Sequence, residues 1–416
     1  MLLVFVVVFK TSAQTLQPGD PAALHFSADR LRRIDKLVKQ YIDSGWIKGA
    51  DAFIARNGKV VYNKAFGVAD AEKNVPMKTD AIFRIASQTK AITSVAVMML
   101  YEEGKLLLDD PISKYIPSFA HPRVLAEFNP KDSSYTTIPA KREITIRDLL
   151  THTSGIDYAQ IGSDKMKAIY AKAGIQAGFV TDKIRLADAI NKLGTLPLVH
   201  QPGERFTYGL NIDVLGYLVE TLSGKSLAQF FKERIFEPLG MNDTYFYLPK
   251  SKFNRLAQVY VPDKHNHLNK WNASTFPGVS ADYPLVDGTY YSGGAGLSST
   301  TRDYAIFLQM LLNNGVYNGH RVLARHTVEM MTMNQIGDLN LGRDKFGLGF
   351  EITTRLGQAR LGQTEGSFSW GGFFGTVYWA DPKEHLVCLF FVQEWPFPHG
   401  ELTDKFRVLV YSALND

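Results

Sequence analysis

The segment FRIASQTK places a hydroxyl, Ser87, and an amine, Lys90, three residues apart at the start of an apolar stretch. Side chains at this spacing on a helix lie on the same side and can meet. Residues 91–100 contain only two polar side chains, Thr93 and Ser94, so a helix here is expected to be buried. Burial disfavours the charged form of an amine, and an uncharged lysine beside a serine hydroxyl can accept its proton. The pair therefore predicts a nucleophile for acyl transfer, although two residues at this spacing also occur by chance.

Two further segments contain residues that would complete such a site. In HQPGERFTYGLNIDVLG, Tyr208 follows a Pro-Gly turn and precedes a predicted helix. In SFSWGGFFGTVYWADP, Gly371 and Gly372 stand at the start of a predicted strand and allow a ligand to approach the backbone closely. The backbone N–H of Phe373 would then act with that of Ser87 as an oxyanion hole. A packed tyrosine and a glycine bulge are the structural alternatives for these two segments.

The patterns around these segments predict helices and strands in a definite order. Residues 27–45 have apolar side chains at helical spacing after a capping Ser27, and Asn57-Gly58 predicts a hairpin. Strands predominate again after 345, in KFGLGFEITT, GGFFGTVYWA and HLVCLFFVQ, and LTDKFRVLVYSAL is typical of a closing helix.

Between these ends lie several helical segments joined by Pro- and Gly-rich connections. We therefore predict an α+β fold in which one antiparallel sheet, built from both ends of the chain, is flanked by the N- and C-terminal helices. The expected sheet domain comprises 27–104 together with 296–416, and the expected inserted, mostly helical domain comprises 105–295.

Composition excludes several classes of function. The chain has 416 residues and a net charge of +5, from 46 basic and 41 acidic side chains that are scattered along it, so no nucleic acid partner is expected. Cys388 is the one cysteine in the sequence, which allows no internal disulfide, and it lies in an apolar run typical of a buried strand. His265 and His267 lie in a polar loop without a metal-binding helix motif. We expect neither a metal nor a cofactor.

The first residues have the pattern of a targeting segment. Residues 1–9 (MLLVFVVVF) are apolar throughout and are followed by Lys10 and small residues. This run is too short for a membrane span, which needs about 20 residues, but it suits the apolar part of a signal peptide. We therefore predict a signal peptide over 1–13 with cleavage after Ala13, export to the periplasm or the medium, and no stable insertion in a membrane.

With these motifs the chain resembles the serine hydrolases with a β-lactamase-type fold: class C β-lactamases, D-Ala-D-Ala peptidases and family VIII carboxylesterases. The resemblance covers about 25–415 and includes LLTHTSGI, IFEPLGMNDT and SGGAGLSSTTRDYAIF besides the Ser-x-x-Lys pair. It implies a β-lactamase/transpeptidase-like fold in which Ser87 is acylated and Lys90 is its partner. It also implies that Tyr208 is the general base in concert with Lys90, and that the N–H groups of Ser87 and Phe373 form the oxyanion hole.

Two departures from the family pattern concern the substrate. Class C β-lactamases have Tyr-x-Asn, whereas here Leu210 takes the asparagine position and Asn211 follows one place later. The third motif begins with Trp370 before Gly371 and Gly372, where lactamases and peptidases have Lys or His. An indole supplies no formal charge for the carboxylate of a β-lactam or a peptide, and it adds apolar surface. These five positions are the candidate substrate-binding residues, and Trp-Gly-Gly is similar to family VIII esterases and related acyltransferases.

The predicted function is hydrolysis of a small-molecule ester through an acyl-enzyme on Ser87, by a serine hydrolase of the β-lactamase-like superfamily. Three alternatives remain open: a β-lactamase or D-Ala-D-Ala peptidase acting on amides, an acyltransferase with the same nucleophile, and a catalytically silent binding module on this fold. Trp370 argues against the first, and the intact set of Ser87, Lys90 and Tyr208 argues against the last. The sequence assigns no oligomeric state.

Overall fold

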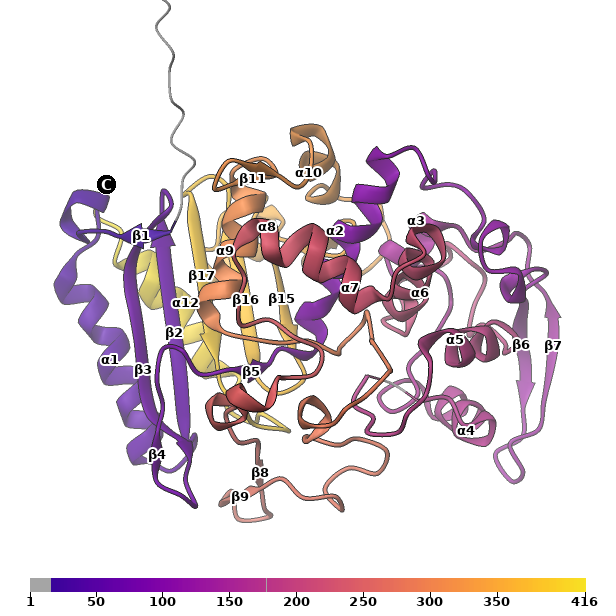
Figure 1. Ribbon diagram of the computed structural model, residues 1–416, viewed down its shortest axis with the longest axis horizontal. Coiled ribbons are helices and arrows are strands. Elements are labelled where there is room, and N and C mark those ends of the chain that lie inside the picture. The colour runs from indigo at the N-terminus through magenta and orange to yellow at the C-terminus, as the bar shows by residue number, and fades with distance from the viewer. Residues whose placement is uncertain (1–15, 177) are drawn as a thin grey trace, which may run out of the picture.

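The computed structural model describes residues 16–176 and 178–416, so the predicted signal peptide over 1–13 lies outside the described residues. The strands of its main sheet are β1 (Gln17–Pro18), β2 (Gly49–Arg56), β3 (Lys59–Asp70), β4 (Val75–Pro76), β13 (Lys345–Phe346), β14 (Glu351–Ile352), β15 (Phe368–Gly372), β16 (Thr376–Asp381) and β17 (Leu386–Phe391). The sheet runs in the order β1-β3-β2-β17-β16-β15-β14-β13, and β4 pairs with β3 (Figure 1). Neighbouring strands are antiparallel, except that β1 and β3 are parallel.

The centre of this sheet joins the two ends of the chain. β2 pairs with β17, with Asp51 opposite Phe391. β2 continues into β3 through Asn57 and Gly58, which have φ angles of 52° and 72°. These positive values are those of the two-residue hairpin turn that an Asn-Gly pair favours. The predicted α+β fold, with a sheet built from both ends of the chain, is confirmed.

Helices cover both faces of the sheet. On one face, Ile54 and Phe390 pack with α1 and α12, and on the other, Phe53 and Leu389 belong to the core beneath α9, as expected from the alternation of side chains along a strand. The helices are α1 (Ala28–Asp43), α2 (Thr89–Glu102), α3 (Ile146–Leu150), α4 (Asp164–Ala173), α5 (Leu186–Gly194), α6 (Asn211–Ser223), α7 (Leu227–Phe231), α8 (Glu237–Leu239), α9 (Thr301–Leu312), α10 (Arg325–Met331), α11 (Arg355–Leu361) and α12 (Glu401–Ser412).

The first helix follows its sequence pattern. The Ser27 side chain accepts a hydrogen bond from the backbone N–H of Arg30 (3.3 Å), which satisfies one of the free donors of the first turn of α1. Leu31, Ile34 and Val38 recur at helical spacing and are buried against the sheet. The predicted closing helix is also present, as α12.

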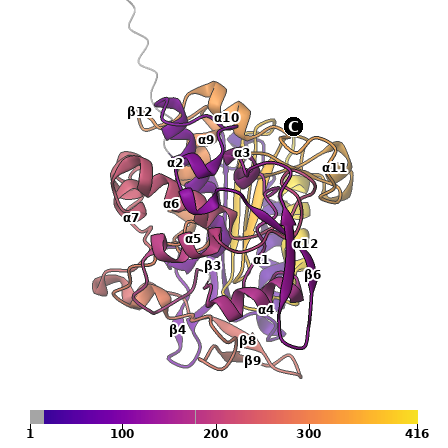
Figure 2. The ribbon, with the colours of Figure 1, turned by 90° about the vertical axis from the view of Figure 1, so that its right-hand side faces the viewer.

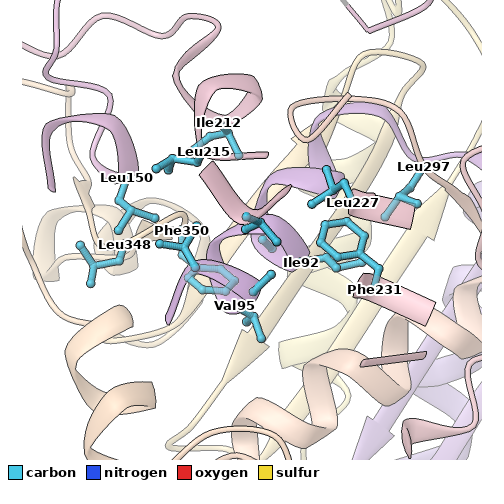
Figure 3. Close-up of a cluster of buried hydrophobic side chains, with 14 of the residues drawn as sticks. Ile92, Val95, Leu150, Ile212, Leu215, Leu227, Phe231, Leu297, Leu348 and Phe350 are labelled. Atoms are coloured by element: carbon cyan, nitrogen blue, oxygen red, sulfur yellow. The ribbon is translucent and has the colours of Figure 1, made fainter. Parts of the chain in front are cut away.

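The helix that begins beside Ser87 is buried on every side. All residues of α2 from Thr89 to Leu100 are buried. Ile92 and Val95 lie among apolar side chains from elements distant in sequence (Figure 3), namely Leu150, Ile212, Leu215, Leu227, Phe231, Leu297, Leu348 and Phe350. A helix that is apolar all round is stable only inside such a core. The core therefore fixes the position of the first turn of α2.

The remaining helices lie largely to one side of the sheet. Helices α3 to α6 gather there with a hairpin of β6 (Arg123–Phe128) and β7 (Tyr135–Pro139), as Figure 2 shows from that side. The other short strands are β5 (Phe83–Arg84), β8 (Tyr260–Pro262), β9 (Leu268–Lys270), β10 (Ser298–Ser299), β11 (Val316–Tyr317) and β12 (His320–Arg321). Within the described residues, no helix has both the length and the apolar character needed to cross a membrane.

One predicted strand is divided in two. β15 ends at Gly372, a turn over 373–375 follows, and β16 then begins. The backbone N–H of Gly375 donates to the carbonyl of Gly372 (3.0 Å), and the φ angle of Gly375 is 80°, a conformation that favours glycine. The prediction of one continuous strand over GGFFGTVYWA is therefore wrong, because Gly375 lets the chain reverse. Gly371 and Gly372 end a strand rather than begin one.

Candidate active site

Ser87 lies in a short turn that connects β5 to α2. Ala86, at the start of a 3-10 turn over Ala86–Gln88, has a φ angle of 46°, in a region that costs a residue other than glycine about 1–2 kcal/mol. Arg84, just before the turn, is 2% exposed and donates to the carbonyls of Ala257 and Ala281. These bonds anchor the backbone on one side of Ser87, and the buried helix α2 anchors it on the other. The strained turn is held between two fixed segments.

Lys90 is 2% exposed, and its amine has three hydrogen-bond partners. Its Nζ atom lies 3.2 Å from Ser87 Oγ, 3.0 Å from the hydroxyl of Tyr158 and 2.6 Å from the carbonyl oxygen of Gly294. The three-residue spacing on the first turn of α2 thus brings the hydroxyl and the amine into contact. An amine that is shielded from water and bonded to a serine hydroxyl is arranged to remove the proton of that hydroxyl.

Two tyrosines flank Lys90 and contact it through different atoms. Tyr158 bonds it through the hydroxyl, whereas Lys90 Nζ lies over the ring of Tyr208, 4.7 Å from its centroid. The two rings are 5.3 Å apart. Burial raises the pKa of Tyr158 well above its usual value, and the neighbouring Tyr208 raises it further. The hydroxyl of Tyr158 therefore stays protonated at neutral pH.

Trp370 forms an uncharged wall beside these tyrosines. Its Nε1–H donates to the hydroxyl of Tyr208 (3.3 Å), and its ring lies 5.3 Å from that of Tyr208 and 5.4 Å from that of Phe346. His152 packs against the same tyrosine at 4.8 Å and is fully buried. Burial and the nearby Lys90 amine lower the pKa of His152, so its ring is neutral as well. This side of the site consists of aromatic rings without formal charge.

The end of β15 lies against the turn that carries Ser87. A Cβ atom on Gly372 would come within 2.5 Å of the carbonyl oxygen of Ile85, so the strand approaches this closely only because the residue is glycine. Ser87 and Phe373 line one cavity, with Tyr158 among its other walls. The two residues predicted to donate to an oxyanion are thus brought to the same cavity.

The carbonyl that receives Lys90 belongs to a glycine turn held by a buried carboxyl group. Oδ1 of Asp213, from the first turn of α6, accepts from Ser292 Oγ (2.5 Å) and from the backbone N–H of Gly294 (3.2 Å). A Cβ atom on Gly294 would lie 2.3 Å from Asp213 Oδ2, so the turn fits over the carboxyl group only as glycine. Burial raises the pKa of Asp213, against the lowering effect of Lys90. Helix α6 therefore positions one of the three acceptors of Lys90.

None of the five predicted substrate contacts is among the walls of this cavity, and two of them are buried in the core. Leu210 is 2% exposed and Asn211 is fully buried, and neither lines the cavity at Ser87. The amide nitrogen of Asn211 lies 2.9 Å from His152 Nδ1, and its oxygen accepts from Ser154 Oγ. The extra residue between Tyr208 and this asparagine places its amide in the first turn of α6, where it bonds to the core instead of a substrate.

Sequence reasoning did not single out Tyr158 or Gly294, and it expected Asp213 to cap its helix or pair locally, whereas its partners are Ser292 and Gly294. Tyr158 follows two residues after LLTHTSGI, and Gly294 lies in SGGAGLSSTTRDYAIF, so both belong to or adjoin segments that carried the family resemblance. The available signal for Asp213 was an acidic residue within the apolar run NIDVLGYLV. None of the three has a neighbour in sequence that indicates a contact with Lys90.

Comparisons with known proteins identify a family and several similar chains. The family model described as Beta-lactamase matches residues 34–412. Esterase EstB of Burkholderia gladioli is 29% identical over 410 residues, which cover 94% of this chain and 98% of EstB. A putative D-alanyl-D-alanine carboxypeptidase of Escherichia coli (strain K12) is 30% identical over 427 residues, which cover 97% of this chain and 91% of the carboxypeptidase. The solved structure of EstCE1, a hydrolase with promiscuous acyltransferase activity, matches with a TM-score of 0.79 and 27% identity. The match covers 92% of this chain and 98% of EstCE1. The resemblance predicted from the motifs is confirmed.

Proposed function

Because the chain belongs to the β-lactamase family, we propose that it is a serine hydrolase that cleaves carboxylic esters through an acyl-enzyme on Ser87. The observation that carries this proposal is the 3.2 Å contact between Ser87 Oγ and the buried amine of Lys90, beside an uncharged aromatic wall. EstB, which is named an esterase, is similar to this chain over most of its length, and this similarity supports ester hydrolysis.

In the first half of the proposed reaction, Ser87 Oγ attacks the ester carbonyl carbon while an uncharged Lys90 accepts the hydroxyl proton. The negative charge that develops on the carbonyl oxygen is stabilised by the backbone N–H groups of Ser87 and Phe373. The bond to the alcohol oxygen then breaks, and the proton passes to the leaving alkoxide. Tyr158, whose hydroxyl contacts Lys90, and Tyr208, whose ring lies beside the amine, offer the path for this proton, and we propose Tyr208 as the base in concert with Lys90.

In the second half, water takes the place of the alcohol. It gives a proton to the pair of Lys90 and Tyr208 and attacks the acyl carbonyl carbon, after which the acid leaves and Ser87 regains its proton. Because the raised pKa of Tyr158 keeps its hydroxyl protonated, Tyr158 does not act as the base; its hydroxyl accepts a hydrogen bond from the Lys90 amine and holds that amine next to Ser87. None of these steps requires a metal or a cofactor.

The substrate class that we propose is an uncharged ester. Trp370, Tyr208 and Phe346 form a wall of rings where lactamases and peptidases have a Lys or His. A carboxylate placed there would lose hydration without gaining a cationic partner. We therefore expect kcat/KM for a chromogenic cephalosporin to be at least about 10-fold to 100-fold below that for p-nitrophenyl butyrate, since the charge-assisted contact between a Lys or His and its carboxylate is absent. Comparable values for both compounds would favour the lactamase or peptidase function instead, in line with the similarity to the putative carboxypeptidase.

Acyl transfer to an alcohol is the second candidate function, because EstCE1 is described as a hydrolase with promiscuous acyltransferase activity. The same acyl-enzyme would then divide between water and the alcohol. Incubation with p-nitrophenyl butyrate and increasing 1-propanol, with butyrate and propyl butyrate measured by gas chromatography, separates the two. We expect butyrate to remain the main product at millimolar propanol. Propyl butyrate in excess at that concentration would make the protein an acyltransferase.

The direct test of the proposed function is the mass of the intact protein after brief incubation with p-nitrophenyl butyrate, with p-nitrophenol release followed in parallel. Ser87→Ala should lower the release rate by roughly 10³-fold or more, as expected when the nucleophile is removed. A trapped butyryl group should map to Ser87 in the unsubstituted protein. Ser412→Ala, in α12 and outside the cavity at Ser87, is the matched control and should react like the unsubstituted protein.

Two results would contradict the proposal. Equal release by Ser87→Ala and by the unsubstituted protein would assign the reaction to another group. Absence of release and of labelling by a fluorophosphonate probe in the unsubstituted protein would favour the silent binding module.

We also propose that the protein is exported, on the basis of the apolar run over 1–9 and the small residues at 11–13. The test is the N-terminal sequence of the protein recovered from the periplasm and the medium of a bacterial host. Export with cleavage after Ala13 gives a chain that begins at Gln14, whereas an uncleaved chain confined to the cytoplasm contradicts this proposal.

A further inference from the structure

The cavity at Ser87 is too small to hold a whole ester. Its volume is about 30 Å³, which is roughly the share of one water molecule in liquid water. Besides Ser87, its walls include Gln160, Phe179, Phe276 and Val279. A substrate whose carbonyl group reaches Ser87 must therefore extend beyond this cavity.

A much larger cavity shares four of these walls. Its volume is about 720 Å³, within the range typical of small-molecule sites. Gln160, Phe179, Phe276 and Val279 line both cavities, so the two adjoin at these side chains. We call the larger cavity the annex; it extends from these four side chains along α4, where Ala171 is one of its walls.

The walls of the annex favour an uncharged, apolar occupant. Ile175, Val180 and Pro277 are among its apolar residues. The charged residues among its walls, Lys167 and Asp182, already have partners within the protein: Lys167 pairs with a neighbouring aspartate at 2.8 Å, and Asp182 accepts from a glutamine side chain at 3.5 Å. An anionic ligand would lose its hydration there and find the one cationic wall residue, Lys167, already paired, whereas an apolar chain gains from leaving water.

Phe373 connects the predicted oxyanion hole to the walls of the annex. Its ring lies 5.5 Å from that of Phe179 and 6.1 Å from that of Phe276. The leaving oxygen of an ester must lie near the proton donors around Lys90 and Tyr158. The acyl chain is therefore the part of the substrate that extends along Phe373 toward the annex.

We propose that the annex binds the distal part of an extended, uncharged acyl chain, and that Phe179 and Phe276 form the passage to it from Ser87. This inference rests on the proposed ester hydrolysis and specifies its substrates as esters of medium- to long-chain acids. Because each methylene that leaves water adds to binding, kcat/KM should rise about tenfold or more from the acetyl to the octanoyl ester.

The test uses p-nitrophenyl esters from acetate to dodecanoate and compares the ratio of kcat/KM for octanoate to that for acetate. Ala171→Trp, at an exposed position of α4 that lines the annex, should occupy part of it and lower this ratio about tenfold. Phe276→Ala widens the passage and should move the optimum to longer chains. Lys172→Trp is the matched control, because the next residue of α4 is also exposed but does not line the annex, and it should keep the ratio of the unsubstituted protein.

A second series keeps the acetyl group and lengthens the alcohol. A chain-length preference that appears in this series and responds to Ala171→Trp would overturn the assignment of the annex to the acyl chain. Equal ratios for Ala171→Trp, Phe276→Ala and the unsubstituted protein would overturn the annex as a binding site. Ser87→Ala is measured in the same experiment. If it is inactive, equal ratios count against the annex alone. If it turns over the esters, the proposed function itself has failed.

Discussion

At the scale of single residues, the carbonyl of Gly294 determines how Lys90 can act. A charged lysine has three N–H donors, and Ser87 Oγ, the hydroxyl of Tyr158 and this carbonyl accept one each. An uncharged lysine has two N–H donors and one lone pair. A carbonyl oxygen can only accept a hydrogen bond, so the carbonyl of Gly294 always binds one N–H of Lys90. The lone pair of the uncharged amine must then face one of the two hydroxyls. The backbone thus orients the amine for removal of a hydroxyl proton.

The first prediction concerns Tyr158. Tyr158→Phe removes the 3.0 Å contact with Lys90, and we expect kcat for p-nitrophenyl butyrate to fall about 10- to 100-fold, because the amine loses one of its positioning contacts. Tyr170→Phe is the matched control: Tyr170 is also buried, but its hydroxyl accepts from the backbone N–H of Asp157. Steady-state kinetics, with thermal unfolding measured for each variant, provide the check. Unchanged kcat in Tyr158→Phe would show that Lys90 does not need this hydroxyl.

At the scale of elements, the site depends on how α2, α6 and the glycine turn over 292–294 meet. Thr93, one turn after Lys90 on α2, donates to the carbonyl of Gly293 (2.7 Å), while Asp213 of α6 accepts from Gly294 on the other side of the turn. A Cβ atom on Gly293 would lie 2.7 Å from the carbonyl oxygen of Ile212, so the backbone of α6 also limits the turn to glycine. The turn is held between two helices, so the carbonyl of Gly294 has little freedom to move relative to Lys90.

The second prediction follows from that arrangement. Asp213→Asn keeps the size of the side chain but removes its negative charge and places a donor beside the N–H of Gly294 or the hydroxyl of Ser292. We expect kcat to fall about tenfold through displacement of the turn, with KM unchanged, since Asp213 does not line the cavity at Ser87. Asp188→Asn, which removes an exposed ion pair on α5, is the control and should leave both constants unchanged. A rise in KM with constant kcat would contradict a positioning role.

At the scale of the whole molecule, one buried carboxyl group joins the sheet to the helix that covers it. Asp51, in the centre of β2, is fully buried, and its Oδ2 accepts from the hydroxyl of Thr301 at the start of α9 (2.7 Å). Its other oxygen is buried without a hydrogen-bond partner among the described residues. Burial raises the pKa of Asp51 from 3.8 to about 7, mainly because the charged form loses its hydration.

The third prediction is a pH dependence of stability caused by Asp51. Since its pKa is higher in the folded than in the unfolded chain, its contribution is fully present below about pH 4 and is lost as the pH rises through 7. The free energy of unfolding should therefore decrease between pH 5 and 8, by at most about 1.4 kcal/mol per pH unit from this group. Asp51→Asn should reduce that decrease, as measured by urea unfolding at both pH values. Asp338→Asn, at an exposed position, should keep it; the same slope in Asp51→Asn and in the unsubstituted protein would contradict the role of Asp51.

Features set by neighbours in sequence were predictable. Ser87 and Lys90 meet because they occupy one turn of one helix, and Asn57-Gly58 reverses the chain because both residues adopt positive φ angles. The single cysteine was expected in a buried strand and lies in β17. In each case the physical cause acts within a few residues.

Contacts between distant segments were not predictable in the same way. Gly294 bonds to Lys90 across 204 positions of sequence, and no local pattern indicates that pair. The placement of Asn211 depends on its buried bond with His152, which one additional residue after Tyr208 makes possible. These contacts are set by how the core packs, because they depend on which buried groups can satisfy one another's hydrogen bonds.

The pairing of β2 with β17 has a consequence for folding during synthesis. On the ribosome, the strand over 49–56 emerges more than three hundred residues before the strand over 386–391 that becomes its neighbour in the sheet. Until the strand over 386–391 has been synthesised, the nascent hairpin of β2 and β3 has an unpaired edge, which is a template for wrong pairing. The sheet can thus close only after that strand has emerged, and partners so far apart in sequence fold slowly. A nascent chain of this protein is therefore expected to depend on chaperones that cover the unpaired edge of β2.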